Sequence, residues 1–263
     1  MQWLFETCVL SDERVAELRE ACDALGLRRT FTLDIDQPPE PRRARPDHGA
    51  EVVAYGSKSV IGYAERMGWR PGAWSGPAFD YANVQKGLGS LFLNADAVAG
   101  RLDNIEQTAK LRSWDRIFIR PADDNKAFAG VLMDIDAIAE WRGAMVKSGY
   151  LSDSSLAVVA AEPQGVKREW RIVLAEDELA GASLYRDASG PKRDQGCPAE
   201  VFGVAQEAAR IYRPAPVFVA DVAEAENDRL AIVEYNAFNS ADLYACDIKS
   251  VVERVTSAAQ RGL

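Results

Sequence analysis

Residues 216–247 read PVFVADVAEAENDRLAIVEYNAFNSADLYACD and contain two apolar, β-branched runs, each ending in an acidic residue. The first run carries Asp221 near its end, and the second ends at Glu234, two residues before Asn236. Because side chains alternate along a strand, Glu234 and Asn236 point to the same face. If the polar turn AEAEND joins the runs as a hairpin, Asp221 lies on that face too. The sequence therefore predicts two carboxylates and an amide oxygen at one end of a sheet.

Such a cluster of acids needs a counter-charge. Two facing carboxylates repel each other, and burial strengthens the repulsion. Mg²⁺ removes it, and this ion prefers oxygen ligands, commonly one or two carboxylates together with substrate phosphates. We therefore interpret Asp221, Glu234 and Asn236 as candidate magnesium ligands. The alternative interpretation of the same pattern is two solvated acids at strand ends.

The N-terminal part of the chain predicts a small α/β layer, because strand and helix patterns alternate there. Ser11 is the expected cap of a helix over residues 12–25, whose apolar positions recur at helical spacing before Gly26. The neighbouring segments predicted as strands are residues 2–6, 29–35 and 51–55, the last followed by a helix to Met67.

A phosphate-binding segment is predicted where the strand RIFIR, residues 116–120, meets the loop ADDNKAFAG. Arg120 offers a rigid, multidentate fork, and Lys126 offers a mobile positive charge. The alternative is a strand end and a solvated turn. Further on, the loop DASGPKRDQGCP has the Gly and Pro content of a mobile lid that carries Lys192 and Arg193.

Two more local features are predicted. Asp134 is the expected cap of a helix running to Lys147. The aromatic segment WRPGAWSG, residues 69–76, is expected to be irregular, either as a packed surface loop or as a wall of the acceptor pocket.

The order and spacing of these motifs resemble a known family. Asp221 followed by Glu234-x-Asn236 on the next strand is similar to the metal-binding end of ATP-grasp enzymes. The segment AFNSADLYACD resembles a divergent ATP-grasp clade named for one arginine and two lysines, which includes a eukaryotic translation-initiation assembly factor. The resemblance extends from Tyr55 to Asp247. It implies an α/β (α+β) fold, with a small N-terminal α/β domain in residues 1–100 and two ATP-enclosing α+β subdomains in residues 101–263.

The resemblance also implies roles for individual residues. The strand that ends in Lys-Pro in other ATP-grasp enzymes ends here in Arg120, and the exit of the strand over residues 155–161 corresponds to the hinge that binds adenine. The implied catalytic residues are Arg120, Lys126 and Arg171, and the implied nucleotide-binding residues are Arg120, Lys126, Val159, Ala160, Ala161, Glu162 and Glu169. The implied metal ligands are Asp221, Glu234 and Asn236.

Several of these positions have a plainer interpretation. Glu169 and Arg171 share a strand face, so they are either a cross-strand ion pair or contacts to the nucleotide and substrate. Asn239, Ser240, Asp242 and Tyr244 follow the metal cluster, and the resemblance suggests that they face metal, phosphate or acceptor; the alternative is a turn and a packed ring.

The activity that the resemblance implies is an ADP-forming carboxylate–amine ligase. ATP with Mg²⁺ would convert a carboxylate to an acyl-phosphate, which an amine then captures as an amide. The expected partners are ATP, a carboxylate substrate and an amine acceptor, either of which is a small molecule or a peptide or protein end. The alternatives are a non-catalytic ATP-binding assembly factor and an ATP-dependent phosphotransferase.

Composition argues against several other classes. The 263 residues, 48% hydrophobic, are enough for a sizeable core, and the net charge of −9 argues against nucleic acid as a partner. His48 is the only histidine, which excludes His-based triads and multi-His metal sites. Four scattered cysteines without a C-x-x-C pair predict reduced thiols, and hence a cytoplasmic protein. We find no signal peptide and no apolar run of about 18 residues, so no membrane partner is expected.

Overall fold

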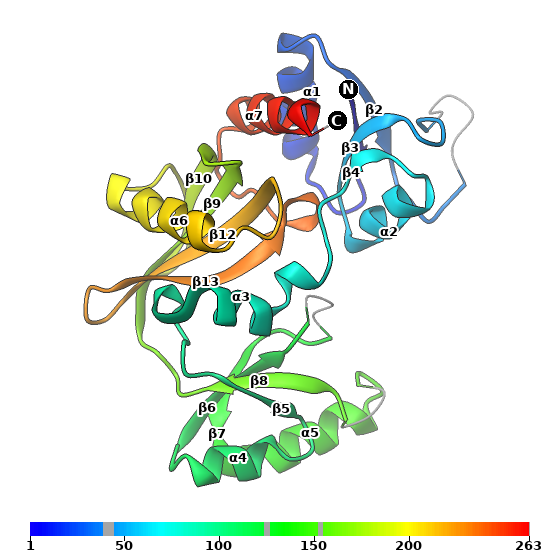
Figure 1. Cartoon of the computed structure of the whole chain (residues 1–263). Coiled ribbons are helices and arrows are strands. Elements are labelled where there is room, and N and C mark those ends of the chain that lie inside the picture. The colour runs from blue at the N-terminus through cyan, green and yellow to red at the C-terminus, as the bar shows by residue number, and fades with distance from the viewer. Residues whose placement is uncertain (39–44, 124–126, 152–154, 263) are drawn as a thin grey trace.

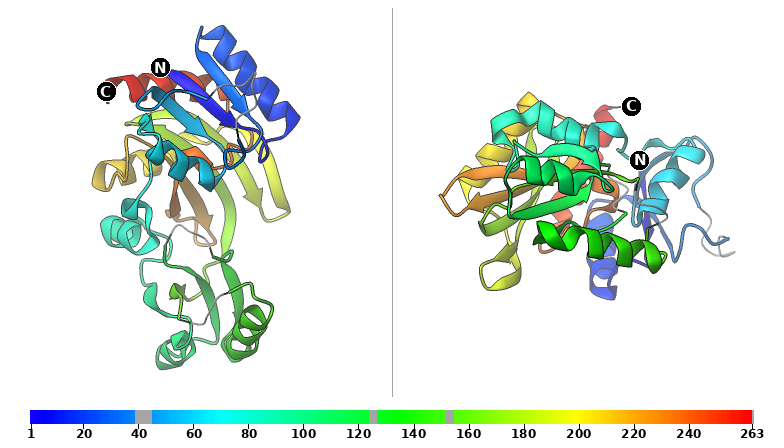
Figure 2. Two further views of the ribbon diagram at one scale, coloured as in Figure 1. Left: turned by 90° about the vertical axis from the view of Figure 1, so that its right-hand side faces the viewer. Right: turned by 90° about the horizontal axis from the view of Figure 1, so that it is seen from below.

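The computed structural model describes residues 1–38, 45–123, 127–151 and 155–262, and its strands form three sheets. A parallel sheet lies at one end of the molecule, an antiparallel sheet of five strands in the middle, and an antiparallel sheet of four strands at the other end (Figures 1 and 2). This arrangement confirms the predicted α/β (α+β) class. Within the described residues, no helix is long and apolar enough to cross a membrane.

The N-terminal sheet has the order β2-β1-β3-β4 with all strands parallel. Its alternation places Trp3 and Phe5 against helix α1, while Leu4 faces α2 on the other side. Ser11 caps α1 as predicted, since its hydroxyl accepts a hydrogen bond from the Arg14 amide. The elements are β1 (Gln2–Glu6), α1 (Asp12–Ala24), β2 (Arg28–Thr32), β3 (Glu51–Tyr55), α2 (Lys58–Arg66) and β4 (Arg70–Gly72).

The central sheet has the order β11-β10-β9-β12-β13 and is antiparallel throughout. Val173 and Val219 point toward α7 and the N-terminal sheet, whereas Ile172 and Ala220 point toward α3 and α6. The strands are β9 (Val166–Ala175), β10 (Glu178–Asp187), β11 (Gly190–Gln195), β12 (Val217–Ala225) and β13 (Leu230–Ala237). The associated helices are η1 (Pro77–Phe79), α3 (Tyr81–Leu88), η2 (Gly89–Leu91), α6 (Ala199–Ile211), η4 (Phe238–Ser240) and α7 (Ile248–Arg261).

The third sheet has the order β5-β8-β6-β7, and its inner face packs on α4 and α5 (Figure 1). Its elements are β5 (Val98–Arg101), α4 (Ile105–Leu111), β6 (Arg116–Pro121), β7 (Val131–Asp134), η3 (Ile135–Ala137), α5 (Ile138–Lys147) and β8 (Ala157–Ala161). The predicted boundary between residues 100 and 101 falls inside β5, and the division into 1–100 and 101–263 stays a prediction.

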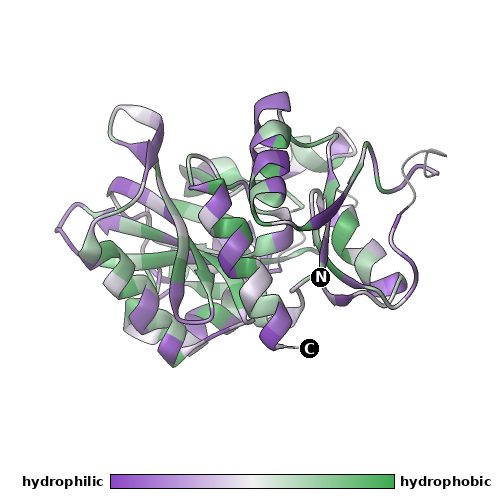
Figure 3. Cartoon of the chain, turned by 90° about the horizontal axis from the view of Figure 1, so that it is seen from above, coloured by the Kyte–Doolittle hydropathy of each residue, from purple (hydrophilic) through white to green (hydrophobic). Residues whose placement is uncertain are grey.

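The two chain termini lie close together because the last helix returns to the first strand (Figure 1). Helix α7 packs beside α1, and the Trp3 indole donates a 2.9 Å hydrogen bond to the Thr256 hydroxyl. The helices show hydrophilic outer faces and hydrophobic faces toward the strands (Figure 3). One apolar core therefore joins the N-terminal sheet, the central sheet and the C-terminal helix.

The structure corrects three local predictions. The segment predicted as a mobile lid forms strand β11, because its Gly and Ser residues build a tight turn in which Asp187 pairs with Gly190. Asp134 ends strand β7 and its side chain caps no helix, since a short 3₁₀ turn precedes α5. The aromatic segment WRPGAWSG, expected to be irregular, contributes β4 to the parallel sheet.

Candidate functional site

Three charged side chains lie in a row across the central sheet. Asp221 on β12 is opposite Arg171 on β9 and opposite Glu234 on β13. Residues directly opposite each other share a face, so the row lies on the side of the sheet that faces the N-terminal domain. Just beyond Glu234, the β12–β13 register shifts by one residue, an irregularity that is common beside active sites. The predicted hairpin therefore forms with the predicted residues on one face.

Arg171 and Asp221 form a buried, bidentate ion pair. The Nε and Nη2 atoms of Arg171 donate to the two Asp221 oxygens at 2.9 and 2.8 Å, and Nη1 donates to the main-chain oxygen of Asp242 at 2.8 Å. Burial acts against the charge of Arg171, but the adjacent Asp221 carboxylate holds its pKa above the usual value. Burial raises the pKa of Asp221, whereas Arg171 acts in the opposite direction. The buried Asp221 carboxylate therefore needs a cation beside it to stay ionised, and in this structure the cation is Arg171.

Arg120 connects the third sheet to this row. It ends strand β6, and its guanidinium donates to Glu234 at 2.5 Å while lying over the Tyr81 ring at 4.7 Å. The Asn94 amide donates to the Tyr81 hydroxyl, and burial raises the pKa of Tyr81 to about 12. The arginine is thus fixed by an aromatic face and a carboxylate at the junction of two sheets.

A cleft of about 330 Å³ opens between the third and central sheets, beside Arg120. Its volume lies within the range of small-molecule pockets. Gly130 lines the cleft, and a β-carbon there would come within 2.8 Å of the Phe118 ring. Glycine at this position keeps space open next to the predicted phosphate-binding arginine. The cleft therefore fits a nucleotide whose phosphates extend toward Glu234 and Asp221.

Glu169, predicted to bind nucleotide, lines the same cleft. Its carboxylate accepts hydrogen bonds from the Tyr185 hydroxyl at 2.6 Å and from Arg186 at 2.7 Å. Glu169 and Arg171 share a face, but the structure does not join them as the ion pair considered above, because each has its own partner. Tyr185 stacks on Tyr244, and both rings lie over Arg171.

The predicted adenine hinge falls partly within a paired strand. The main chain of Val159 and Ala160 lies in β8 between β5 and β6, so both of its edges are used by the sheet ladder. Ala161 ends the strand, Glu162 is exposed after it, and the cleft itself is lined by Pro163 and Gln164. An adenine ring in the cleft would therefore meet main-chain groups after Ala160. Lys126 lies outside the described residues.

The residues that follow the predicted metal ligand Asn236 divide into two groups. Asn239 is fully buried and turns away from the row, because its side chain bonds the main chain of Ala54 and Trp74. Asp242 and Tyr244 stay beside Arg171, with Tyr244 at a φ of 44°. A positive φ is uncommon for such a residue and is found disproportionately at functional sites.

The donor set of the row fits a magnesium ion. The Asn236 amide nitrogen donates to a Glu234 oxygen at 3.0 Å and to an Asp221 oxygen at 3.5 Å, so two carboxylates and an amide converge. Within the described part of the chain there is no cluster of three or more His, Cys, Asp and Glu side chains able to hold a metal, so phosphate oxygens would complete the shell. Asp221, Glu234 and Asn236 would hold the ion, which would neutralise phosphate charge.

The model of a known family matches residues 94–254, and this family is an ATP-grasp domain, the second family of the clade named for one arginine and two lysines. The chain belongs to this ATP-grasp family. ATP-grasp domains are characteristic of ATP-dependent ligases, which places the chain in a ligase family and confirms the resemblance seen in the sequence. No functionally curated protein shows significant similarity to the sequence.

Solved structures share this ATP-grasp fold over almost the whole chain. D-cycloserine synthetase DcsG is 13% identical, with a TM-score of 0.67 over 99% of this chain and 98% of that one. D-alanyl-alanine synthetase A from Vibrio cholerae is 11% identical, with a TM-score of 0.62 over 99% of both chains. The ATP-grasp ligase PsnB, complexed with a precursor variant, Mg and ADP, is 10% identical, with a TM-score of 0.53 over 97% of both chains.

Sequence reasoning missed parts of this ATP-grasp site that come from distant segments. Tyr81 and Asn94 precede the predicted nucleotide-binding strand and carry no motif, yet they hold Arg120 in place. Tyr185 and Arg186, near the end of strand β10, carry no motif either, yet they bind Glu169. The only sequence signal for Tyr185 and Arg186 as site residues is their position near the end of a predicted strand.

Proposed function

We propose that the protein is an ADP-forming carboxylate–amine ligase that uses ATP and Mg²⁺. The observation that carries this proposal is the row of Arg171, Asp221 and Glu234, which meets Arg120 at the mouth of the cleft. The site offers cations and metal-binding oxygens for phosphates. Among the described residues it contains no Ser–His or Cys–His pair, so the nucleophile is expected to come from the substrate.

The proposed reaction proceeds in two displacements. A substrate carboxylate oxygen attacks the γ-phosphorus of ATP, the bond to the β,γ-bridging oxygen breaks, and ADP leaves. An amine then attacks the acyl carbon, the bond to the phosphate oxygen breaks, and phosphate leaves while the amine loses a proton to solvent. Arg120 would stabilise charge on the transferred group, since preorganised cations act most strongly in a partly buried site.

The proposed magnesium requires the ion pairs to rearrange. Asp221 and Glu234 are each bound to an arginine in this structure, and a metal with phosphates would take over both partners. Arg120 and Arg171 would then be released toward the phosphates. The same ion pairs favour a second candidate, an ATP-binding factor without turnover, in which Arg171 keeps Asp221. ADP release separates the two.

The test is ADP release and nucleotide affinity in Glu234→Gln, which keeps the shape of the side chain and removes one charge. We expect turnover to fall roughly 10²–10³-fold, which corresponds to about 3–4 kcal/mol of transition-state stabilisation. Binding of an ATP analogue should weaken less, and at about 100 times its dissociation constant it should stabilise the wild type by about 2.7 kcal/mol. Glu140→Gln, on the exposed face of α5, is the matched control.

Arg120→Lys provides the complementary variant, because it keeps the charge but loses the guanidinium fork. Near-normal turnover in both Glu234→Gln and Asp221→Asn would show that the metal assignment is wrong. Absence of any stabilisation by nucleotide with magnesium would contradict ATP binding itself. Phosphate ester in place of amide as the product would identify a phosphotransferase.

A further inference from the structure

Two hollows outside the nucleotide cleft lie between helix α1, strand β11 and the start of α7. The inner hollow has a volume of about 600 Å³ and reaches Tyr55, Asp242 and Tyr244. The outer hollow has a volume of about 630 Å³ and reaches Glu20 and Lys249. Both are lined by Glu17, Arg193 and Ala245, so they lie next to each other there. We call the two together the α1 groove.

The inner end of the α1 groove adjoins the proposed reaction centre. The Tyr244 ring, which lines the inner hollow, lies 4.8 Å from the Arg171 guanidinium, and Arg171 also bonds the main-chain oxygen of Asp242. Arg171 in turn holds Asp221. A substrate group in the inner hollow would therefore be separated from the row of charges only by the residues that hold Arg171.

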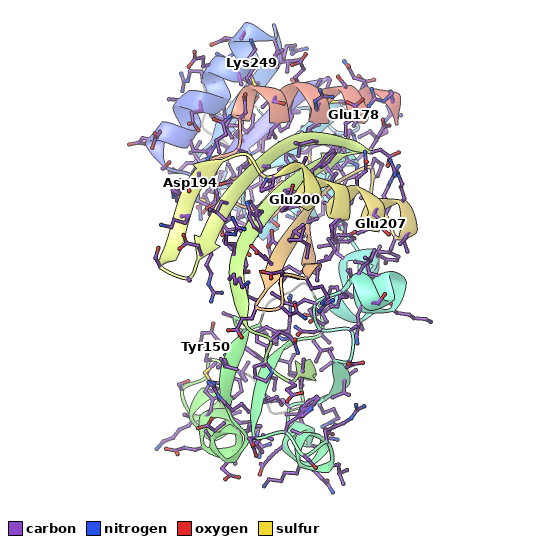
Figure 4. The ribbon with its side chains drawn as sticks, turned by 90° about the vertical axis from the view of Figure 1, so that its left-hand side faces the viewer. Tyr150, Glu178, Asp194, Glu200, Glu207 and Lys249 are labelled. Atoms are coloured by element: carbon purple, nitrogen blue, oxygen red, sulfur yellow. The ribbon has the colours of Figure 1, made fainter. Side chains whose placement is uncertain are left out.

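The size of the α1 groove argues for a long ligand. Each hollow alone is within the volume range of pockets for drug-sized molecules, and the two together exceed it. In Figure 4 the outer end is marked by Lys249, where α7 meets α1, and the β11 side by Asp194. A single amino acid would occupy a small part of this length, whereas an extended segment of several residues would fill it.

The charges of the α1 groove argue for a cationic ligand. Glu13, Glu17 and Glu20 are spaced by four and three residues, so they form one exposed face of α1 along the groove. Glu17 is bound to Arg14, but within the described chain neither Glu13 nor Glu20 has an ion-pair partner. The net charge of −9 adds a long-range attraction for positive ligands.

On the basis of the ligase function proposed above, we infer that the α1 groove binds the amine-bearing substrate as an extended, cationic peptide segment. Its ammonium groups lie along the carboxylates of α1, and the reacting amine enters the inner hollow toward Asp242. Lys249, at the outer end, contacts main-chain carbonyl oxygens of the segment.

The test measures binding of a fluorescein-labelled hexapeptide of alternating lysine and alanine to the full chain by fluorescence anisotropy, without nucleotide. Glu13→Gln combined with Glu20→Gln should weaken binding at least about five-fold, since each exposed charge pair is worth up to about 1 kcal/mol. The control is Glu140→Gln with Glu207→Gln, which removes the same net charge from α5 and α6, away from the groove (Figure 4). This control should bind nearly as well as the wild type.

Arg193→Glu tests the charge of the α1 groove by an expected gain in peptide affinity, which damage to the fold would not produce. The side chain is exposed, and its reversal places a third unpaired carboxylate in the α1 groove, so the peptide should bind more tightly. Equal weakening in the groove variant and the control would mean that only the net charge attracts the peptide, and the inference would be wrong. Acetyl-lysine amide binding as tightly as the hexapeptide would replace the peptide by a small amine.

The peptide-binding test can succeed or fail separately from the proposed ligase activity. Peptide binding in the groove without any stabilisation by ATP and magnesium would support the groove and contradict the ligase. Stabilisation by ATP and magnesium would leave the ligase intact and overturn the groove if neither the lysine hexapeptide nor a labelled hexapeptide of alternating glutamate and alanine binds. Binding of the glutamate-containing peptide alone would also overturn the cationic class.

Discussion

Asn239 holds the N-terminal sheet to the central sheet through both ends of its side chain. Its amide nitrogen donates to the main-chain oxygen of Ala54 at 2.5 Å, and its oxygen accepts from the Trp74 amide at 2.8 Å. Its own main-chain oxygen accepts from the Gly56 amide at 2.9 Å. A buried side chain with all its groups satisfied in this way has a structural role, in spite of its position shortly after the predicted metal ligands.

Asn239→Ala should therefore lower the free energy of unfolding by about 3 kcal/mol, because it leaves a buried amide and a buried carbonyl without their partners. Urea denaturation followed by circular dichroism measures this change. Ser240→Ala, at the next residue, should change it by about 0.5 kcal/mol or less. A variant that kept its stability but lost substrate affinity would instead show Asn239 to be a ligand-binding residue.

At the scale of elements, the hairpin of β10 and β11 differs most from the sequence-based prediction. Its Gly, Ser and Pro residues serve a two-residue turn, and Lys192 forms an ion pair with Asp187 at 3.4 Å across it. Arg193 and Gln195 then point into the α1 groove from one face of the strand. A segment whose composition is typical of a mobile loop is here a paired strand that forms one wall of the α1 groove.

Hydrogen exchange should show that strand β11 is already ordered before any nucleotide is added. We expect the ladder amides of residues 190–195 to exchange slowly in the free protein, with little further protection from an ATP analogue and magnesium, because they are already bonded to β10. Residues of the cleft around Gly130 serve as the internal comparison and should gain protection. A large gain of protection in β11 on nucleotide binding would support the lid that the sequence predicted.

At the scale of the whole molecule, buried tyrosines join the sheets and make stability dependent on alkaline pH. Burial raises the pKa of Tyr55, Tyr81, Tyr185 and Tyr235, in the case of Tyr81 to about 12. In the unfolded chain these phenols ionise near their usual value of about 10. The folded state thus keeps protons that the unfolded state releases.

The sign of the pH effect follows from this difference. Below about pH 10 these four tyrosines hold their protons in both states and do not affect stability, whereas above it each lowers the free energy of unfolding by about 1.4 kcal/mol per pH unit. Burial also raises the pKa of the Cys22 and Cys246 thiols, so these two groups lower stability already above about pH 8.5. The four tyrosines together give roughly 5.6 kcal/mol per pH unit. Denaturant titrations between pH 8 and pH 11, with phenolate absorbance as a second signal, measure the slope.

Tyr235→Phe is the matched variant for this measurement. The Tyr235 hydroxyl is buried and has no hydrogen-bond partner in the part of the chain that the structure describes. Its removal should stabilise the protein by about 1 kcal/mol at neutral pH and reduce the alkaline slope by about 1.4 kcal/mol per pH unit. An unchanged slope would mean that Tyr235 titrates equally in both states.

The sequence by itself determined the strands of the central hairpin, the cap of α1, the ATP-grasp resemblance, and the grouping of Asp221, Glu234 and Asn236. These follow from local rules, because alternation, capping and a short turn act over a few neighbouring residues. Only the tertiary structure decided which cations neutralise the acids. Arg171 reaches Asp221 across 50 residues and Arg120 reaches Glu234 across 114, and no local pattern encodes such pairings. The α1 groove has the same origin, since it is formed by segments that meet only after the sheets have packed.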